Sequence, residues 1–404
     1  MKMAHEILIV GGGLVGGSVA CALAAAGRDV ALIEVTDPIS ASPPSFDERN
    51  LALAAASLSA LEALGVLQHL QTPPAPVRQV HVSRVGDFGA LRLDASEVGR
   101  DALGGVVIAR ELGAALEARL AQLPTLKRYR PLRFVGLRAD AESIEIECAA
   151  ATTAPSQRLS ARLLLACDGS DSAVREALGI ATVDHDYRQS LIVSALQCER
   201  PHAGNAWERF TASGPLALLP RADGSYGCVC GVASADVDAL MRLSDGDWLA
   251  ELQQRFGGRA GRFLRVGKRS VYPIKSRIAQ LLVAPRTLLL GNAAQTLHPI
   301  GAQGFNLGLR DALCVADLIA DVDDPGAPHL LATYPAHRQS DRQQTIAFSD
   351  GLARLTSGES FPHHLLRSLG MLALANAPGL RAPLVSGAMG YRGKLLTSTA
   401  AASA

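Results

Sequence analysis

The feature that most constrains the fold is an uncharged stretch of 21 residues, Ile7 to Gly27, near the start of the chain. By its length this stretch could cross a bilayer or act as a signal sequence. Its glycines cluster in the middle, however, where they would weaken a membrane-spanning helix most. The apolar run from Ile7 to Val10 is typical of a buried parallel strand. We therefore expect a strand, a glycine-rich turn and an Ala-rich helix.

The spacing of the glycines predicts a nucleotide-binding βαβ unit. Gly11, Gly13 and Gly16 form a Gly-x-Gly-x-x-Gly pattern, and a second strand ends at Glu34. The glycines permit a tight turn, close approach of a pyrophosphate, and close packing of helix on strand. The helix N-terminus attracts phosphates, and the carboxylate can accept hydrogen bonds from a ribose. The pattern predicts an ADP-containing cofactor, NAD or FAD, against the alternative of a plain tight turn.

Composition narrows the class of protein. With 39 basic and 38 acidic residues the formal net charge is +1, which gives no reason to expect nucleic-acid binding. The length of 404 residues predicts two or three domains. Seven cysteines, without Cys-x-x-Cys spacing, indicate free thiols in a reducing cytosol and no metal site. A second glycine trio after a strand is also missing, so a reductase with two dinucleotide folds is not expected.

Two later segments carry further motifs. In the first, an apolar strand ends at Cys167 and is followed by Asp168-Gly169. A carboxylate at that edge can bind a cofactor hydroxyl, although an Asp-Gly turn before a helix N-cap has the same sequence. In the second, a strand ends at Gly291-Asn292, and a loop with His298-Pro299 leads to a glycine-rich turn and a helix from about Phe305. That helix N-terminus would stabilise negative charge on the ring of a reduced flavin.

These motifs, in this order, resemble the FAD-dependent aromatic hydroxylases of the para-hydroxybenzoate hydroxylase type. Within them the chain is most similar to the ubiquinone-biosynthesis hydroxylases, in particular the 2-polyprenyl-6-methoxyphenol hydroxylases. The likeness runs from about residue 5 to about residue 393. The strings that carry it are GNAAQTLHP, GFNLGLRD, GPLALLP, GKRSVYP and RQSDRQQTI.

The resemblance implies a set of cofactor-binding residues. The glycines and Glu34 would hold the ADP half of FAD, and Asp168 would serve both FAD and NADPH. Arg49 and Arg110 match residues that reach the cofactor, with surface ion pairs as the alternative for both. The expected cofactor-binding residues are Gly11, Gly13, Gly16, Glu34, Arg49, Arg110, Asp168, Asn292, Gly301, Gln303, Gly304 and Asn306.

No catalytic base stands out in the sequence. His298 and Pro299 are the candidate catalytic residues, because they lie in the loop that would border the flavin ring. A structural histidine that caps this loop is the alternative. The family usually has Ala-Gly-Gln-Gly where this chain has Gly-Ala-Gln-Gly at 301–304. If residue 302 requires a positive φ, Ala302 would be strained or the loop would have shifted.

The resemblance also implies an interleaved α/β organisation. A Rossmann-like FAD-binding domain would comprise residues 1–76, 101–180 and 271–345, and a mixed-sheet substrate domain residues 77–100 and 181–270. Residues 346–404 would form C-terminal helices and a tail. A basic run from Arg262 to Arg277 would be either a solvated edge or a docking surface for NADPH phosphates or a partner.

The expected activity is hydroxylation of a polyprenyl (methoxy)phenol in ubiquinone biosynthesis. NADPH or NADH would reduce FAD, and O2 would then form a flavin C4a-hydroperoxide. Alternatives are another ring position, a non-prenylated phenol, another reaction on the same fold, or a flavin-binding assembly subunit. The protein would be cytoplasmic or peripheral at the inner membrane. The segment from Gly351 to Lys394 would dock on a membrane or a biosynthetic complex, or would simply pack in the core.

Overall fold

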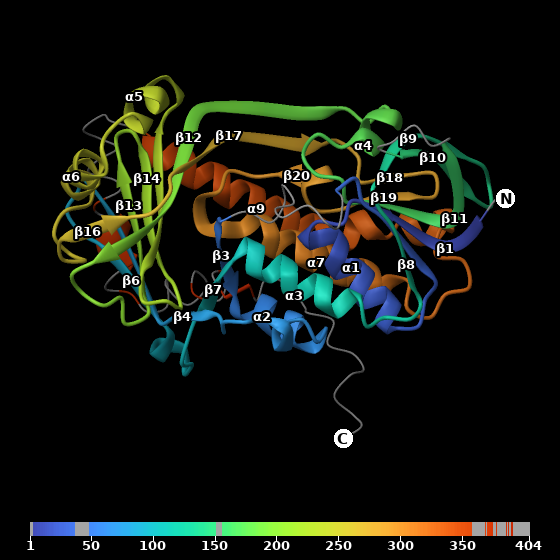
Figure 1. Ribbon diagram of the computed structural model, residues 1–404, viewed down its shortest axis with the longest axis horizontal. Coiled ribbons are helices and arrows are strands. Elements are labelled where there is room, and N and C mark those ends of the chain that lie inside the picture. Colours follow the sequence, from blue (N-terminus) through green and yellow to red (C-terminus); the bar gives the residue numbers. More distant parts are fainter. Residues whose placement is uncertain are drawn as a thin grey trace.

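The computed structural model describes residues 3–36, 48–150 and 156–357 of the 404, with a few further positions between 368 and 390. Two β-sheets lie towards opposite ends of the long axis, and helices occupy the space between them (Figure 1). One sheet is largely parallel and the other is mixed, which confirms the expected α/β fold class.

The largely parallel sheet contains the predicted nucleotide-binding unit. Its strands are β1 (Met3–Val10), β2 (Val30–Ile33), β8 (Leu126–Tyr129), β9 (Leu132–Ala139), β10 (Ile144–Ala150), β11 (Gln157–Ala166), β18 (Val283–Ala284) and β19 (Thr287–Leu289). The order is β18-β19-β11-β1-β2-β8, and β10 pairs with β11 and β9. Ile7 of β1 lies opposite both Leu163 and Val30. Residues Ile7 to Ile9 are fully buried, so the uncharged start begins with a core strand as expected.

The main helices pack closely against this sheet and against each other. They are α1 (Leu14–Ala25), α3 (Ala109–Leu120), α7 (Gln303–Leu318) and α9 (Tyr334–Ser357). A Cβ on Gly17 of α1 would lie 2.5 Å from Leu116 of α3. A Cβ on Gly308 of α7 would lie 2.6 Å from Val15 of α1. Small residues are therefore required where α1 contacts both neighbours, because the interior has no room for further atoms.

The second sheet has nine strands in the order β20-β17-β12-β15-β14-β13-β5-β6, with β16 paired to β12. Its strands are β5 (Gln79–Arg84), β6 (Leu91–Asp94), β12 (Thr182–Cys198), β13 (Asn205–Thr211), β14 (Gly214–Pro220), β15 (Tyr226–Ala233), β16 (Phe263–Val266), β17 (Ser270–Ala279) and β20 (Gln295–Thr296). The helices α5 (Val237–Met241) and α6 (Asp245–Phe256) lie on its outer face. Trp248 of α6 is buried there against Ile192 and Leu218. The opposite face of the sheet is turned towards the first sheet.

A small third sheet and short helices join these parts. The third sheet has the order β3-β7-β4, with β3 (Asn50–Ala54), β4 (Ala75–Val77) and β7 (Gly104–Ile108). The short helices are α2 (Ala55–Ala63), α4 (Ala173–Ala177) and α8 (Pro328–Leu331). The paired strands β12 and β17 extend from the nine-stranded sheet towards α4 and the parallel sheet (Figure 1). The chain thus passes between the two main sheets several times.

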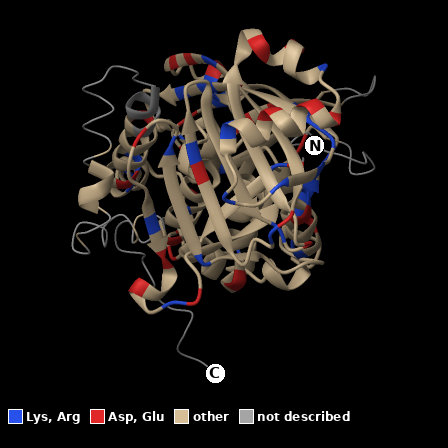
Figure 2. Cartoon of the chain, turned by 90° about the vertical axis from the view of Figure 1, so that its left-hand side faces the viewer, with Lys and Arg blue, Asp and Glu red and all other residues tan. Residues whose placement is uncertain are grey.

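Charges on the end that holds the nine-stranded sheet are mixed in sign. Figure 2 shows Lys and Arg there interspersed with Asp and Glu. Among the described residues, the ion pairs of the basic run are Arg262–Glu199, Arg269–Asp245, Lys275–Asp186, Arg277–Asp171 and Arg277–Asp184. Acids from other segments therefore balance part of this run, which favours a solvated edge. Within the described ranges, no helix has both the length and the apolarity needed to cross a bilayer. Most of the proposed docking segment from Gly351 to Lys394 lies outside the described residues.

Candidate functional site

Four parallel strands end side by side, and this brings the three predicted motifs together. The backbone N–H of Gly11 donates to the Ile33 carbonyl (2.9 Å), and that of Cys167 donates to the Val10 carbonyl (2.8 Å). The N–H of Leu290 donates to the Ala166 carbonyl (3.0 Å). The turns after β1, β2, β11 and β19 therefore lie at one carboxyl edge, where ligands of open α/β sheets bind.

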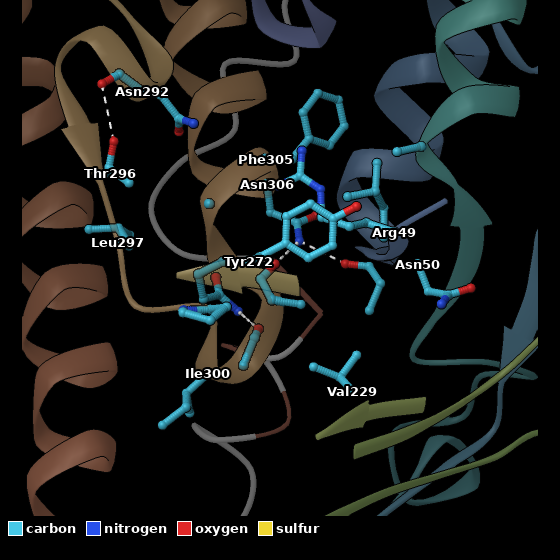
Figure 3. Close-up of a pocket in the computed structure, with 18 of the residues that line it drawn as sticks. Arg49, Asn50, Val229, Tyr272, Asn292, Thr296, Leu297, Ile300, Phe305 and Asn306 are labelled. Atoms are coloured by element: carbon cyan, nitrogen blue, oxygen red, sulfur yellow. Dashed lines mark hydrogen bonds between the residues drawn. The ribbon is translucent and has the colours of Figure 1, made fainter. Parts of the chain in front are cut away.

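A cavity of about 1340 Å³ separates this edge from the inner face of the nine-stranded sheet. It exceeds the roughly 300–1,000 Å³ of ordinary small-molecule sites. Gly11, Glu34, Asp168 and Asn292 line one end of it, and apolar side chains of the sheet line the other. In Figure 3, Asn306 and Arg49 lie to either side of the Tyr272 ring, and Val229 lies below them. The cavity is large enough for a dinucleotide together with a second ligand.

The glycine turn is required by its own packing. Gly11 has a φ of +100°, and a Cβ on it would lie 2.8 Å from the Asp168 Cα and nearer still to the Cys167 carbonyl. A Cβ on Gly16 would overlap the Gly11 carbonyl oxygen. Gly13 is the N-cap of α1, and no side chain caps that helix. The first N–H groups of α1 are therefore available to an anion.

Glu34 links the end of β2 to the glycine turn. Its Oε2 accepts from the Gly12 N–H (2.6 Å), and its Oε1 accepts from the Thr36 N–H (2.8 Å). A carboxylate oxygen can accept a second hydrogen bond, so the pair still has capacity for two hydroxyls. The side chain thus shapes the turn and remains suited to a ribose.

Asp168 caps a short helix and also lines the cavity. Its carboxylate accepts from the Ser172 hydroxyl (2.5 Å) and from the Val174 N–H (3.1 Å), and Ser172 is the N-cap of α4. Burial raises the pKa of Asp168 above its usual range, although these hydrogen bonds oppose the shift. The residue also lines the cavity. It therefore orders the start of α4 and presents a polar group to a ligand.

The two predicted arginines lie in different environments. The Arg49 guanidinium lies 5.2 Å from the centre of the Tyr272 ring and lines the cavity (Figure 3). Arg110 is 51% exposed, and its Nε lies 2.8 Å from the Glu48 carboxylate. Arg110 is not among the residues that line the cavity. The structure thus brings Arg49 to the other motifs and places Arg110 in a surface ion pair.

The loop before α7 has an unusual backbone. Gly301 and Ala302 have φ values of 73° and 51°, in the left-handed region. Position 302 therefore does require a positive φ, and the alanine there carries roughly 1 kcal/mol of strain. Gln303 opens α7 and donates from Nε2 to the Gly301 carbonyl (2.9 Å). No side chain caps this helix, so its first N–H groups are available beside the cavity.

Asn306 fixes this loop to β3. Its Oδ1 accepts from the Ala54 N–H (2.9 Å) and the Ser57 hydroxyl (2.7 Å). Its Nδ2 donates to the carbonyls of Ala52 (3.0 Å) and Ala302 (2.7 Å). The amide already has four hydrogen bonds within the protein, so its contribution is to hold the wall of the cavity in place.

His298 lies behind the loop, whereas Pro299 lines the cavity. The ring is 2% exposed, and its Nδ1 accepts from the Ile300 N–H (3.2 Å). It packs edge-on against Tyr187 at 4.6 Å, and the Tyr187 hydroxyl donates to Asp350 (2.6 Å). Burial lowers the pKa of His298 to about 4, so the imidazole is neutral near pH 7. This is the geometry of the loop-capping alternative.

Two cavity residues were not anticipated from the sequence. The amide atoms of Asn50 are buried without a hydrogen-bond partner in the part of the chain that the structure describes, as a site for a polar ligand would leave them. Glu208 of β13 also lines the cavity, between Ala206 and Phe210 on the same face. The alternation of β13 was the one available signal, because it places this carboxyl on the face of two apolar neighbours.

The comparisons with known proteins agree with this architecture. The FAD binding domain family matches residues 4–349. The chain is 36% identical to "Ubiquinone hydroxylase UbiL" of Rhodospirillum rubrum, over 95% of this chain and 89% of that protein. It is 30% identical to "3-demethoxyubiquinol 3-hydroxylase" of Escherichia coli, over 95% of this chain and 98% of that protein. In fold it is similar to p-nitrophenol 4-monooxygenase from Pseudomonas putida, with a TM-score of 0.79 at 18% identity over 96% and 99% of the two chains.

The nucleotide-binding unit, the convergent turns and the large cavity thus agree with the FAD binding domain family and leave room for a second ligand. The cofactor of this chain is FAD, and its chemistry is that of an aromatic monooxygenase that uses O2 on a phenolic substrate. The chain belongs to the FAD-binding family of flavin-dependent monooxygenases, within the group of ubiquinone-biosynthesis hydroxylases.

Proposed function

We propose that this enzyme hydroxylates the ring of a polyprenylated methoxyphenol in ubiquinone biosynthesis, with NADPH or NADH and O2 as co-substrates. The single observation that carries the proposal is the cavity, which is polar at the strand edge and apolar along the nine-stranded sheet. A phenol with a long hydrocarbon tail needs both kinds of surface, because the ring must meet the cofactor while the tail leaves water.

The residues at the polar end suit the binding of FAD. We propose that the N-terminus of α1 binds the pyrophosphate, Glu34 the ribose, and Arg49, Asp168 and Asn292 the segment that leads to the ring. The turn from Pro299 to Gly304 borders the ring, and the uncapped start of α7 stabilises negative charge at its edge. Bound FAD supplies the redox chemistry, in which electrons from NAD(P)H activate O2.

The chain's own contribution is to hold the substrate ring and exclude water. Phe210, Pro215, Leu191 and Tyr272 come from four strands and form an apolar wall opposite the flavin turn. A water-excluded ring held at about 3–3.5 Å from the reacting oxygen reacts without loss of the oxidising equivalent to solvent. Further apolar residues line the same cavity and suit a prenyl tail: Val80, Leu91, Leu93, Leu103, Met371 and Leu374.

Two assignments from the sequence take a specific form in this proposal. His298 acts through its hydrogen bond from Ile300, which holds Pro299 and Gly301 against the cavity. The interleaved segments 1–76, 101–180 and 271–345 carry FAD, and 77–100 with 181–270 carry most of the substrate wall, to which Tyr272 at the start of 271–345 also contributes. The nicotinamide of NAD(P)H binds transiently in the same cavity. Contact of the protein with the membrane surface delivers the lipid-tailed substrate.

The test is turnover by the FAD-loaded enzyme. The probe is 2-geranyl-6-methoxyphenol in detergent micelles, with NADPH and NADH compared under air. The expected result is stimulated nicotinamide oxidation together with a singly hydroxylated ring, identified by mass spectrometry. Complementation of strains that lack individual ring hydroxylases then identifies the ring carbon. A flavin-loaded protein that shows no stimulation and complements no strain would overturn the proposal and favour an assembly role.

A further inference from the structure

Glu208 is a carboxyl placed in the apolar wall of the substrate side of the cavity. It lies on β13 between Ala206 and Phe210, which point to the same face. Across the sheet its partners are Val82 of β5 and Ala217 of β14, both of which also line the cavity. On the far side of Val82, Leu91 of β6 lies opposite it and also lines the cavity. The carboxyl therefore has apolar neighbours along its own strand and on both neighbouring strands, and it lines the cavity.

One other charged residue on this face, Arg84, pairs with an acid of its own turn. Arg84 of β5 lies opposite Phe210, one position further along the same face. It is paired with Asp87 of the following turn (3.8 Å) and donates to the Val85 carbonyl (3.3 Å). β6, β14 and β15 present apolar residues to the cavity, and the remaining charges that line it are Glu34, Arg49, Arg133, Asp168, Asp171 and Lys275, on other elements. Burial alone accounts for the shift that raises the pKa of Glu208 to about 7.

Such a carboxyl is unfavourable for folding and suited to proton transfer. An ionised carboxylate in an apolar wall loses hydration that nothing in the wall replaces. A carboxyl whose pKa is near 7 is, by contrast, available in both protonation states, which is the condition for an efficient general base. Perturbed carboxyls of this kind gather at functional sites.

The position of Glu208 in the sheet fits a ring held against the flavin turn. Ala217 lies opposite Val229 of β15, so Glu208, Ala217 and Val229 form one row across three strands. Neighbouring strands are about 4.8 Å apart, which puts Glu208 roughly 10 Å along the sheet from Val229. Val229 faces the loop at Ile300 in Figure 3. A phenol lying over this row can reach the carboxyl with its hydroxyl while its ring lies near the loop.

We propose that Glu208 binds the ring hydroxyl of the phenolic substrate and takes its proton as the ring is hydroxylated. In this step the phenol O–H bond breaks, its electron pair stays on the ring oxygen, and an O–H bond forms on the carboxylate. The phenolate is richer in electrons at the ring carbons, which favours attack on an electrophilic oxygen. The carboxyl returns the proton when the product ring oxygen is reprotonated. This inference rests on the proposed function, because it requires a phenol in the cavity.

The test compares Glu208→Gln and Glu208→Asp with the wild-type holoenzyme. Glu251→Gln is the matched control, because Glu251 pairs with Arg255 on α6 and does not line the cavity. The probes are 2-geranyl-6-methoxyphenol and its O-methyl ether, which has no hydroxyl proton. The readouts are flavin content, product formation, uncoupled NADPH oxidation and the pH profile of product formation.

We expect product formation by the wild type to fall about tenfold per pH unit below about pH 7, where the carboxyl is protonated. Glu208→Gln should lose about 100-fold or more in product formation and lose this pH dependence, with flavin content and uncoupled oxidation retained. Glu208→Asp should recover part of the rate together with the pH dependence, and Glu251→Gln should match the wild type. For the wild type we also expect tighter binding of the phenol than of the ether, by a margin that increases above about pH 7, as read from flavin absorbance.

Two outcomes would overturn parts of this scheme in distinguishable ways. If wild type hydroxylates the phenol and Glu208→Gln does so within threefold with the same pH profile, Glu208 is not the base. If Glu208→Gln does not fold, equal affinity of wild type for phenol and ether at all pH values has the same meaning. If the wild type itself neither hydroxylates nor binds the phenol, the proposed function fails as well.

Discussion

The two walls of the cavity are built in different ways. The strand edge is made of backbone turns, in which Gly11, Glu34 and Asp168 each contact residues of their own or a neighbouring motif. The sheet wall is made of single side chains from strands that are far apart in the sequence, such as Tyr272 of β17 and Glu208 of β13. The first wall presents backbone N–H groups together with polar side chains that its turns hold in place, and it suits a cofactor common to many proteins. The second presents side chains, so its chemistry can change one residue at a time without changing the fold.

The largest effect is expected at Gly11, because the turn at the strand edge has no room for a side chain there. We expect Gly11→Ala to cost about 3–5 kcal/mol in the free energy of unfolding, since it combines a φ of +100° with a steric overlap. The protein should also purify with little flavin. Urea unfolding and the flavin-to-protein ratio measure the two effects.

Gly27 provides the matched control for this substitution. It also has a positive φ (+83°), yet a Cβ there would meet no atom within 4 Å. Gly27→Ala should therefore cost only about 1 kcal/mol and leave the flavin content unchanged. Equal effects of the two substitutions would show that the overlap at Gly11 is relieved by a small shift of the turn.

The same difference between the walls explains what the sequence could predict. The strand, turn and helix around Gly11 were predictable because their signals are local. At Ala302 the sequence predicted strain or a shifted loop only if the position requires a positive φ, and the structure shows that φ is 51° there. Glu208 could not be assigned, because its neighbours depend on β13 pairing in parallel with β5, and no local pattern predicts that pairing. For Arg110 the sequence left cofactor contact and a surface ion pair open, and the ion pair with Glu48 depends on a residue 62 positions away in the sequence.

Substitutions at Asn306 and Asn292 can separate two roles of residues at the strand edge, namely support of the loop and contact with the cofactor. Asn306→Ala would leave one backbone N–H, one hydroxyl and two carbonyls without their partner. We expect this to lower the free energy of unfolding by about 2–4 kcal/mol. Asn292→Ala, at an exposed position on the cavity, should leave the melting temperature unchanged and weaken FAD affinity. Thermal unfolding of the apoprotein and flavin titration measure the two. A drop in FAD affinity without loss of stability in Asn306→Ala would contradict the supporting role.

Glu208 in the sheet wall should destabilise the protein when its buried carboxyl is ionised, and the free energy of unfolding should therefore depend on pH. Burial raises the pKa of Glu208 from 4.5 to about 7, so the penalty is absent below about pH 4.5 and complete above about pH 7. Glu208→Gln should therefore match wild type near pH 4 and be more stable near pH 8, by up to about 3 kcal/mol. Urea unfolding of the apoprotein at several pH values measures this difference. A variant that is less stable than wild type at high pH would indicate that the carboxylate has a compensating partner.

The smallest expected effect is at the junction of the two walls, where Ala302 occupies a left-handed conformation with a φ of 51°. Ala302→Gly removes roughly 1 kcal/mol of backbone strain, and the added freedom of glycine in the unfolded chain offsets part of it. We expect a net gain of about 0.5 kcal/mol, which differential scanning calorimetry of wild type and variant can resolve. Gly301→Ala should destabilise the protein, because it would place a side chain at the preceding left-handed position. The added Cβ would also lie 3.2 Å from Phe348. If Ala302→Gly lowers the melting temperature instead, the methyl group of Ala302 contributes packing that outweighs the strain. Residue 302 would then contribute through its side chain, as the residues of the sheet wall do, and not through its backbone conformation.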